Sequence, residues 1–417
     1  MPIVNINALK PGMVLAEDLT APDGRMLLPK GSVLTEAHLR TCRVWNIPEA
    51  SIQGEEEDDY PTSFSQIDPQ VLDICKIMAA RRFVLNPTTH PAVRELARLY
   101  VLRLSRGLTP EKAQWMLSAC PHDDDLDLFG PIPTDSTLDP DQVVNREMEL
   151  ASLPNIFFQI SESLKNPRSS SSYVAEIISK DVALAAKLLK MVNTPFYGFT
   201  HKIDTLSRAV TIVGTSQLTN LALGLSVISV FDGIPEKFFT LKDFWFHSVI
   251  CGILARLLAE QAGIEGDEKF FVAGLLHDIG RLVMLRNHPR RAAEVLSRAA
   301  SGRKSLVNVE KAIWGCTHAD IGERMLRKWG LPEFLETMVA YHHTPMAGPV
   351  PREAAVICMA DFLAHSLDIG ESGHTLVPEL VTKAWDTLNI KTDQLADLTR
   401  KAERQATTIM AAFFPGD

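Results

Sequence analysis

Apolar residues follow two different periods along the chain, and the change of period separates a short N-terminal region from a long remainder. In the first 54 residues, short apolar stretches alternate with Gly, Pro and Asp turns, which is typical of strands. The expected strands are 4–9, 13–19, 25–28 and 47–52. Thr35 can cap one helix that runs to Val44. This pattern predicts a small β-rich N-terminal domain over residues 1–54.

From residue 66 onward, apolar residues recur at helical spacing. Ser170 and Asp181 can each cap one of these helices. The run of acidic residues at 55–59 and the stretch rich in Pro and Asp at 121–140 are typical of linkers. The predicted divisions after the N-terminal domain are a helical segment flanked by linkers at 55–140, a helical domain at 141–350, and C-terminal helices packing on that domain at 351–417. The expected fold class is therefore mainly α, an all-helical bundle with a small β-rich N-terminal domain.

Composition and charge narrow the possible functions. The 417 residues are 46% hydrophobic and 22% charged, which is an ordinary globular composition. A net charge of -9, from 42 basic and 51 acidic residues, argues against a protein that wraps nucleic acid. The longest nearly uncharged apolar run, 221–231, is much shorter than the ~20 residues of a membrane span. No secretory signal is visible and the six cysteines never approach CxxC spacing, so we expect a cytoplasmic protein with reduced thiols.

Histidines and carboxylates concentrate between residues 243 and 361, within otherwise apolar helices. The set is Asp243, His247, His277, Asp278, His318, His342, His343 and Asp361. Burying several carboxylates beside histidines is costly unless they share a cation. Imidazole and carboxylate suit iron, manganese, zinc or nickel. The pattern therefore predicts a site for one or two divalent ions, which could activate water and clamp a phosphate.

A single histidine in a protein core more commonly forms a hydrogen bond with a helix carbonyl oxygen than binds a metal, so the prediction depends on the whole set. The other histidines lie in polar or loop-like surroundings, and we expect them at the surface. They are His38, His90, His122, His201, His288, His365 and His374.

The order of these residues resembles that of the HD superfamily of metal-dependent phosphohydrolases. More closely, residues ~145–345 resemble the HDOD domain, an HD-related output domain of bacterial signalling. The motifs that carry this resemblance are Leu153-Pro154, 187–198, 209–214, 244–248, 273–280, 318–322, Trp329-Gly330-Leu331-Pro332 and His342-His343. Residues 9–19 also resemble small domains that precede HD-GYP and HDOD modules.

The resemblance implies an all-α regulatory domain, with the eight residues above matching the metal ligands of the superfamily. HDOD proteins are generally regarded as signalling or scaffold modules, whereas HD-GYP relatives cleave cyclic di-GMP. Two departures from the active enzymes stand out. No Gly-Tyr-Pro segment follows His343, and the lysine that usually follows His-Asp-x-Gly is Arg281. Arginine can hold a phosphate but is not an equivalent proton donor.

Three hypotheses remain open at this point. The first is a non-enzymatic signalling protein that binds partner proteins or a nucleotide-like ligand. The second is a metal-dependent phosphohydrolase, in which His277 and Asp278 hold ions and Arg281 steadies the phosphate; Asp278 and Arg281 are the candidate catalytic residues. The third is nucleic-acid binding through the arginines of 94–106 or the helices of 174–193. The sequence does not indicate an oligomeric state.

Overall fold

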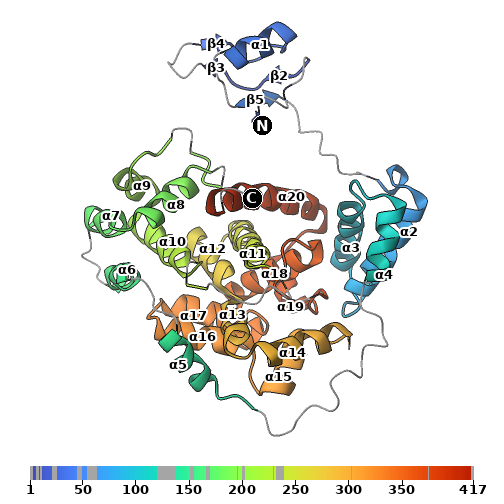
Figure 1. Cartoon of the computed structure of the whole chain (residues 1–417), viewed down its shortest axis with the longest axis vertical. Coiled ribbons are helices and arrows are strands. Elements are labelled where there is room, and N and C mark those ends of the chain that lie inside the picture. Colours follow the sequence, from blue (N-terminus) through green and yellow to red (C-terminus); the bar gives the residue numbers. More distant parts are fainter. Residues whose placement is uncertain are drawn as a thin grey trace. The chain divides into compact units, whose positions relative to one another are not determined.

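The computed structural model divides the chain into two compact units, Met1–Ile67 and Asp68–Asp417 (Figure 1). The structure describes residues 3–5, 9, 12–20, 26–44, 49–53, 63–119, 137–150, 155–165, 170–194, 196–199, 202–228, 230–231, 239–301, 303–373 and 375–414. The acidic run predicted as a linker lies outside these residues, as does most of the predicted linker at 121–140.

The first unit is a small β-rich domain, as predicted. Its elements are β1 (Ile3–Asn5), β2 (Val14–Leu15), β3 (Leu19–Thr20), β4 (Met26–Leu28), α1 (Glu36–Val44), β5 (Glu49–Gln53) and the 3-10 turn η2 (Phe64–Gln66). Strands β1 and β2 both pair antiparallel with β5, and β3 pairs with β4. The cap at Thr35 is confirmed, because its hydroxyl oxygen accepts the His38 N–H at 3.3 Å. Leu15, Leu34 and Leu39 belong to the buried core of this unit.

The second unit is helical. Its α-helices are α2 (Pro69–Arg82), α3 (Pro91–Leu104), α4 (Pro110–Ala119), α5 (Pro140–Leu150), α6 (Asn155–Lys165), α7 (Ser171–Ser179), α8 (Val182–Val192), α9 (Leu206–Val213), α10 (Thr215–Ile228), α11 (Leu241–Gln261), α12 (Asp267–Leu276), α13 (Ile279–Asn287), α14 (Pro289–Ser301), α15 (Leu306–Trp314), α16 (His318–Lys328), α17 (Glu333–Tyr341), α18 (Pro351–Leu367), α19 (Thr382–Leu388) and α20 (Leu395–Phe413), with 3-10 turns η4 (Pro345–Ala347) and η5 (Thr392–Gln394). The predicted caps of α7 and α8 are confirmed, since Ser170 and Asp181 accept N–H groups of the first turns.

Helix α11 lies at the centre of this unit, in contact with α12, α18 and α20 (Figure 1). It is buried along most of its length, which is typical of a helix enclosed by others. Two glycines allow α12 to approach it closely. A Cβ atom on Gly274 would lie 2.7 Å from the Cα of Gly252, so a side chain at this crossing would force the helices apart. This crossing positions the C-terminal end of α12, where the His-Asp pair follows.

Helices α2 and α3 belong to the second unit, where α2 contacts α3, and α3 contacts α18 and α20. Arg82 donates hydrogen bonds to the carbonyl oxygens of His365 and Thr375 and pairs with Asp368 at 2.8 Å. The arginines of 94–106, considered above as phosphate ligands, include two with internal partners. Arg98 pairs with Glu95, and Arg103 donates to the Leu367 carbonyl oxygen and pairs with Glu403.

Replacing Arg82 with methionine is expected to lower the free energy of unfolding by about 2 kcal/mol, because hydrogen bonds from a charged donor to the carbonyl oxygens of His365 and Thr375 are lost. Urea denaturation of the purified chain measures this. The matched control is Arg98→Met, which breaks a more exposed pair within one helix and should cost less than about 0.5 kcal/mol. Equal losses in the two variants would mean that Arg82 does not tie α2 to the C-terminal helices.

Among the described residues, no single helix has both the length and the apolar character needed to cross a membrane. Helices α9 and α10 reach that threshold only as a pair, and they are bent by 118° with respect to each other.

Candidate metal centre

The His-Asp pair lies at the junction of two helices. His277 follows the last residue of α12, and Asp278 precedes the first residue of α13. Asp278 occupies the N-cap position but makes no side-chain cap hydrogen bond. Its carboxylate is instead completely buried beside the histidines. Local helix chemistry would have used this carboxylate as a cap, so its orientation indicates a role in the buried cluster.

Three histidines are held so that one ring nitrogen faces the centre of the cluster. The Nδ1 atoms of His277 and His342 each lie 2.7 Å from a carbonyl oxygen of their own helix, and Nδ1 of His318 lies 2.7 Å from the Glu310 carboxylate. Because these oxygens only accept, each Nδ1 donates and each Nε2 is left for the cluster. Metal-binding histidines are oriented by bonds of this kind.

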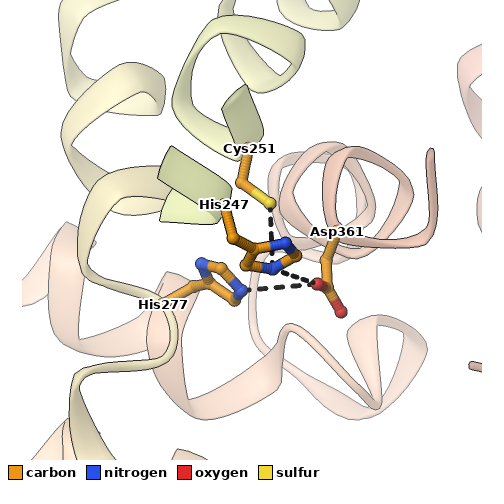
Figure 2. A group of neighbouring side chains, drawn as sticks. All are labelled: His247, Cys251, His277 and Asp361. Carbon is orange, nitrogen blue, oxygen red and sulfur yellow. Dashed lines mark hydrogen bonds and ion pairs between the residues drawn. The ribbon is translucent and has the colours of Figure 1, made fainter. Parts of the chain in front are cut away.

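One group of donor atoms joins α11, α12 and α18, and Figure 2 shows its four side chains. They are His247, Cys251, His277 and Asp361, whose ligand atoms lie within 4.8 Å of one another. Oδ1 of Asp361 lies 3.2 Å from Nε2 of His247 and 3.4 Å from Nε2 of His277. The Cys251 sulfur lies 3.5 Å from the same His247 nitrogen.

Two further donor groups adjoin the first. One consists of His318, His342 and His343, and the other of His277, Asp278 and His342. Nε2 of His318 lies 2.9 Å from Nε2 of His343 and 3.2 Å from Oδ1 of Asp278. Because Asp278 lies between the groups, its carboxylate could be shared by two ions, as in a bridged two-metal site.

Arg281 is an internal cation of this cluster. Its Nη1 lies 2.7 Å from Oδ2 of Asp278, and its Nη2 lies 3.4 Å from Nε2 of His318. The side chain of Ser372 accepts a further hydrogen bond from Nη1 at 2.6 Å. A guanidinium therefore occupies one side of the carboxylate that would bridge two ions.

Burial and mutual charge separate the histidines into two kinds. Burial opposes the charged form of His277, but the Asp278 and Asp361 carboxylates outweigh it and raise the pKa of His277 to about 10. Burial and the neighbouring His365 lower the pKa of His247 to about 4, although Asp361 opposes this change. Burial and His277 lower the pKa of His342 to about 3. The latter two imidazoles are therefore neutral near pH 7, the form in which histidine binds a metal.

The donor set fits divalent iron, manganese, zinc or nickel, since it combines imidazoles with carboxylates and one cysteine sulfur. Seven of the eight residues predicted from the sequence meet in these groups: His247, His277, Asp278, His318, His342, His343 and Asp361. Six of them, all but the half-buried His343, are at most 2% exposed.

Asp243 is placed elsewhere. It lies in the first turn of α11, where its Oδ2 accepts a 2.7 Å hydrogen bond from the Thr240 hydroxyl and its N–H donates to the same hydroxyl. Among the described residues it is in none of the donor groups. Thr240 is the N-cap of α11, and the Asp243 carboxylate holds its hydroxyl in place, so Asp243 has a local role at the start of the helix.

One prediction about the remaining histidines is wrong. His365, expected at the surface, is 3% exposed and its Nε2 lies 3.2 Å from Oδ1 of Asp361. The physical reason is that Arg82 of α2 covers the C-terminal end of α18, which buries surroundings that the sequence predicts to be polar. The four-residue spacing from Asp361 to His365 was the available signal, because it places both on one helix face. His122, His201 and His374 lie outside the described residues.

Comparison with known proteins finds a domain family that matches part of the helical unit. Residues 150–345 match the HDOD domain. The chain is 25% identical over 250 residues to a protein of Treponema pallidum (strain Nichols) named only as uncharacterized. That match covers 59% of this chain and 48% of the Treponema protein, so this chain matches about half the length of its curated relative.

Solved structures share the fold. A provisionally named phosphohydrolase of Shewanella amazonensis superposes with a TM-score of 0.54 at 23% identity, covering 65% of this chain and 97% of that one. An HDOD domain protein of Geobacter sulfurreducens superposes with a TM-score of 0.52 at 21% identity, and the match covers 67% of this chain and 100% of that one. A provisionally named signal transduction protein of Marinobacter aquaeolei superposes with a TM-score of 0.52 at 20% identity, and the match covers 70% of this chain and 63% of that one. At these identities the likeness establishes the fold alone.

Proposed function

We propose that the chain is a signal-transduction protein and that residues 150–345, which match the HDOD domain, bind a partner protein or a small ligand without hydrolysing it. The observation that carries this proposal is the ion pair of Arg281 with Asp278 inside the buried cluster. Two-metal hydrolysis needs a carboxylate shared between ions and a substrate phosphate that reaches them. Here Arg281 partly neutralises the Asp278 carboxylate. Six of the seven predicted ligand residues are almost completely buried, which limits the access of a substrate phosphate.

A turnover assay tests this function. The full chain, loaded with manganese or iron, is expected to show no multiple turnover of cyclic di-GMP or of bis(p-nitrophenyl) phosphate. Turnover at ordinary enzyme rates, on the order of 1 s⁻¹ or faster, would contradict the proposal. In this proposal the N-terminal unit makes a second contact with the partner protein. A chain that lacks residues 1–67 should therefore retain less of the partner in a pull-down than the full chain does.

The donor groups themselves favour a second function, that of a metal-dependent phosphohydrolase. His247, His277 and Asp361 would hold one ion, and His318, His342 and His343 would hold another, with Asp278 between them. A bound divalent ion supplies a Lewis acid and lowers the pKa of bound water. The protein would contribute the fixed orientation of each imidazole and the Arg281 guanidinium for an anionic phosphate.

Metal content is expected to depend on His277. Protein purified after growth in metal-supplemented medium should contain iron, manganese, zinc or nickel by elemental analysis. His277→Ala should bind at least about tenfold more weakly, because it removes a donor of two groups at once. His38→Ala, in the N-terminal unit, is the matched control and should retain the metal. Wild-type protein without metal would contradict the metal centre.

A further inference from the structure

Cys251 is a donor of the first group, although the eight ligand residues predicted from the sequence do not include it. It lies four residues after His247 in α11, so the two side chains share one face of that helix. Both point toward the side chains of His277 and Asp361 (Figure 2). The cysteine is completely buried, and its sulfur lies 3.5 Å from Nε2 of His247. A sulfur in this place changes which ion the group prefers.

The first group has a place for a cation between His277 and Asp361. Because Nδ1 of His277 donates to the Gly274 carbonyl oxygen, the neutral ring presents a lone pair at Nε2. That atom lies 3.4 Å from Oδ1 of Asp361, and neither side chain is more than 3% exposed. Electron pairs that face each other in the core repel, so the space between them suits a cation. A proton on His277 fills this role without metal, and a metal ion displaces that proton when it binds.

The separations of the donor atoms match a four-coordinate ion. Zinc bonds of about 2.0–2.1 Å to nitrogen or oxygen and about 2.3 Å to sulfur place tetrahedral ligands roughly 3.3 Å apart, or about 3.6 Å where one is sulfur. Oδ1 of Asp361 lies 3.2 Å from Nε2 of His247 and 3.4 Å from Nε2 of His277. The sulfur lies 3.5 Å from the same His247 nitrogen. Two nitrogens, one oxygen and one sulfur can therefore complete a tetrahedron from protein atoms alone.

The first group is closed, whereas the neighbouring carboxylate is used elsewhere. Oδ2 of Asp278 pairs with Arg281 at 2.7 Å, and its Oδ1 lies 3.2 Å from Nε2 of His318. The four residues of the first group are at most 2% exposed, whereas His343 in the second group is half-buried. Structural zinc sites are closed in this way, and sites that exchange a ligand keep an open position.

We propose that the first group binds zinc in a closed, four-coordinate site, with the Cys251 thiolate as one ligand and no position left for water. Thiolate and imidazole select zinc, whereas a site of carboxylates would suit manganese. The thiol proton leaves when the ion binds, because a coordinating thiol is deprotonated. The inference deepens the proposed function, on which it rests, because an ion without a free position holds α11, α12 and α18 together and activates no water.

Cobalt(II) tests this with the metal-free full chain, because it occupies zinc sites and its absorption spectrum reports the ligands. The wild type should develop a near-ultraviolet thiolate-to-cobalt charge-transfer band and the intense visible bands of four-coordinate cobalt. Cys251→Ser should abolish the charge-transfer band and weaken zinc binding at least about tenfold. A folded wild type that binds cobalt without this band, or a band that survives in the variant, would overturn the proposal.

Cys358→Ser is the matched control. Cys358 is 7% exposed, lies in the same helix as Asp361 and is in none of the donor groups among the described residues. This variant should keep the band, and its loss here would overturn the assignment to Cys251. Cys251→Ala leaves no polar atom in the core and should also lack the band, while circular dichroism verifies the helical fold. The turnover assay is independent: turnover would contradict the proposed function, whereas a missing band without turnover would contradict only the zinc site.

Discussion

Gly280→Ala is expected to lower the free energy of unfolding by about 3 kcal/mol, although alanine is intrinsically the better helix former. The cause is the close approach of α13 and α16. A Cβ atom at this position would collide with the carbonyl oxygen of His318 and lie 2.8 Å from the backbone nitrogen of Gly322. Both obstacles are backbone atoms, so they can move away only if the helices separate. Separation would also withdraw His318 from Asp278.

Urea denaturation measures this loss, and Gly107→Ala is the matched control. Gly107 has a positive φ of 59° and nothing within 4 Å of the added Cβ. Its replacement should cost only about 1 kcal/mol, for the left-handed backbone. If Gly280→Ala costs no more than the control, the close approach of α13 and α16 does not hold the cluster together.

Arg281→Met is expected to make stability depend on metal. Without metal, the variant should lose about 3–5 kcal/mol, because the buried Asp278 carboxylate loses its guanidinium partner. With excess manganese or zinc, the loss should shrink, since the ion then neutralises the carboxylate. The affinity for metal should rise at least about tenfold over the wild type, because the guanidinium no longer competes for Asp278. Thermal unfolding and calorimetric titration with each metal measure the two effects.

Arg286→Met controls for the loss of a buried ion pair as such. Arg286 pairs with the buried Glu147 at 2.7 Å, outside all the donor groups. Its replacement should also destabilise the protein, but added metal should not restore the stability. Identical metal affinities in Arg281→Met and the wild type would mean that Arg281 and the ion do not compete for Asp278, which would contradict the proposed non-hydrolytic function.

Features that depend on neighbouring residues could be predicted from the sequence. The caps at Thr35, Ser170 and Asp181 formed as expected, because each hydrogen bond joins residues within three positions of each other. The mainly helical character followed from the spacing of apolar residues. The ordered series of histidines and carboxylates identified the HDOD region, because its motifs follow one another along the chain.

Asp243 and His365 show where local spacing failed. Asp243 lies four positions before His247 in α11, and His365 lies four positions after Asp361 in α18. Only His365 contacts its neighbour in the donor groups, through the Asp361 carboxylate. The difference lies in the position along each helix. Asp243 is in a first turn, where its carboxylate accepts a hydrogen bond from the Thr240 hydroxyl, whereas His365 is covered by α2. Spacing alone cannot distinguish these two outcomes.

The sequence by itself determined the fold class, the N-terminal β-rich domain and seven of the residues that meet in the donor groups. Only the tertiary structure decided that Arg281 pairs with Asp278, that α3 packs against α18 and α20, and that Cys251 joins the first donor group. The physical reason is that hydrogen bonds and helix periods are set within a few residues. Ion pairs across helices and the space between them depend on how distant segments pack.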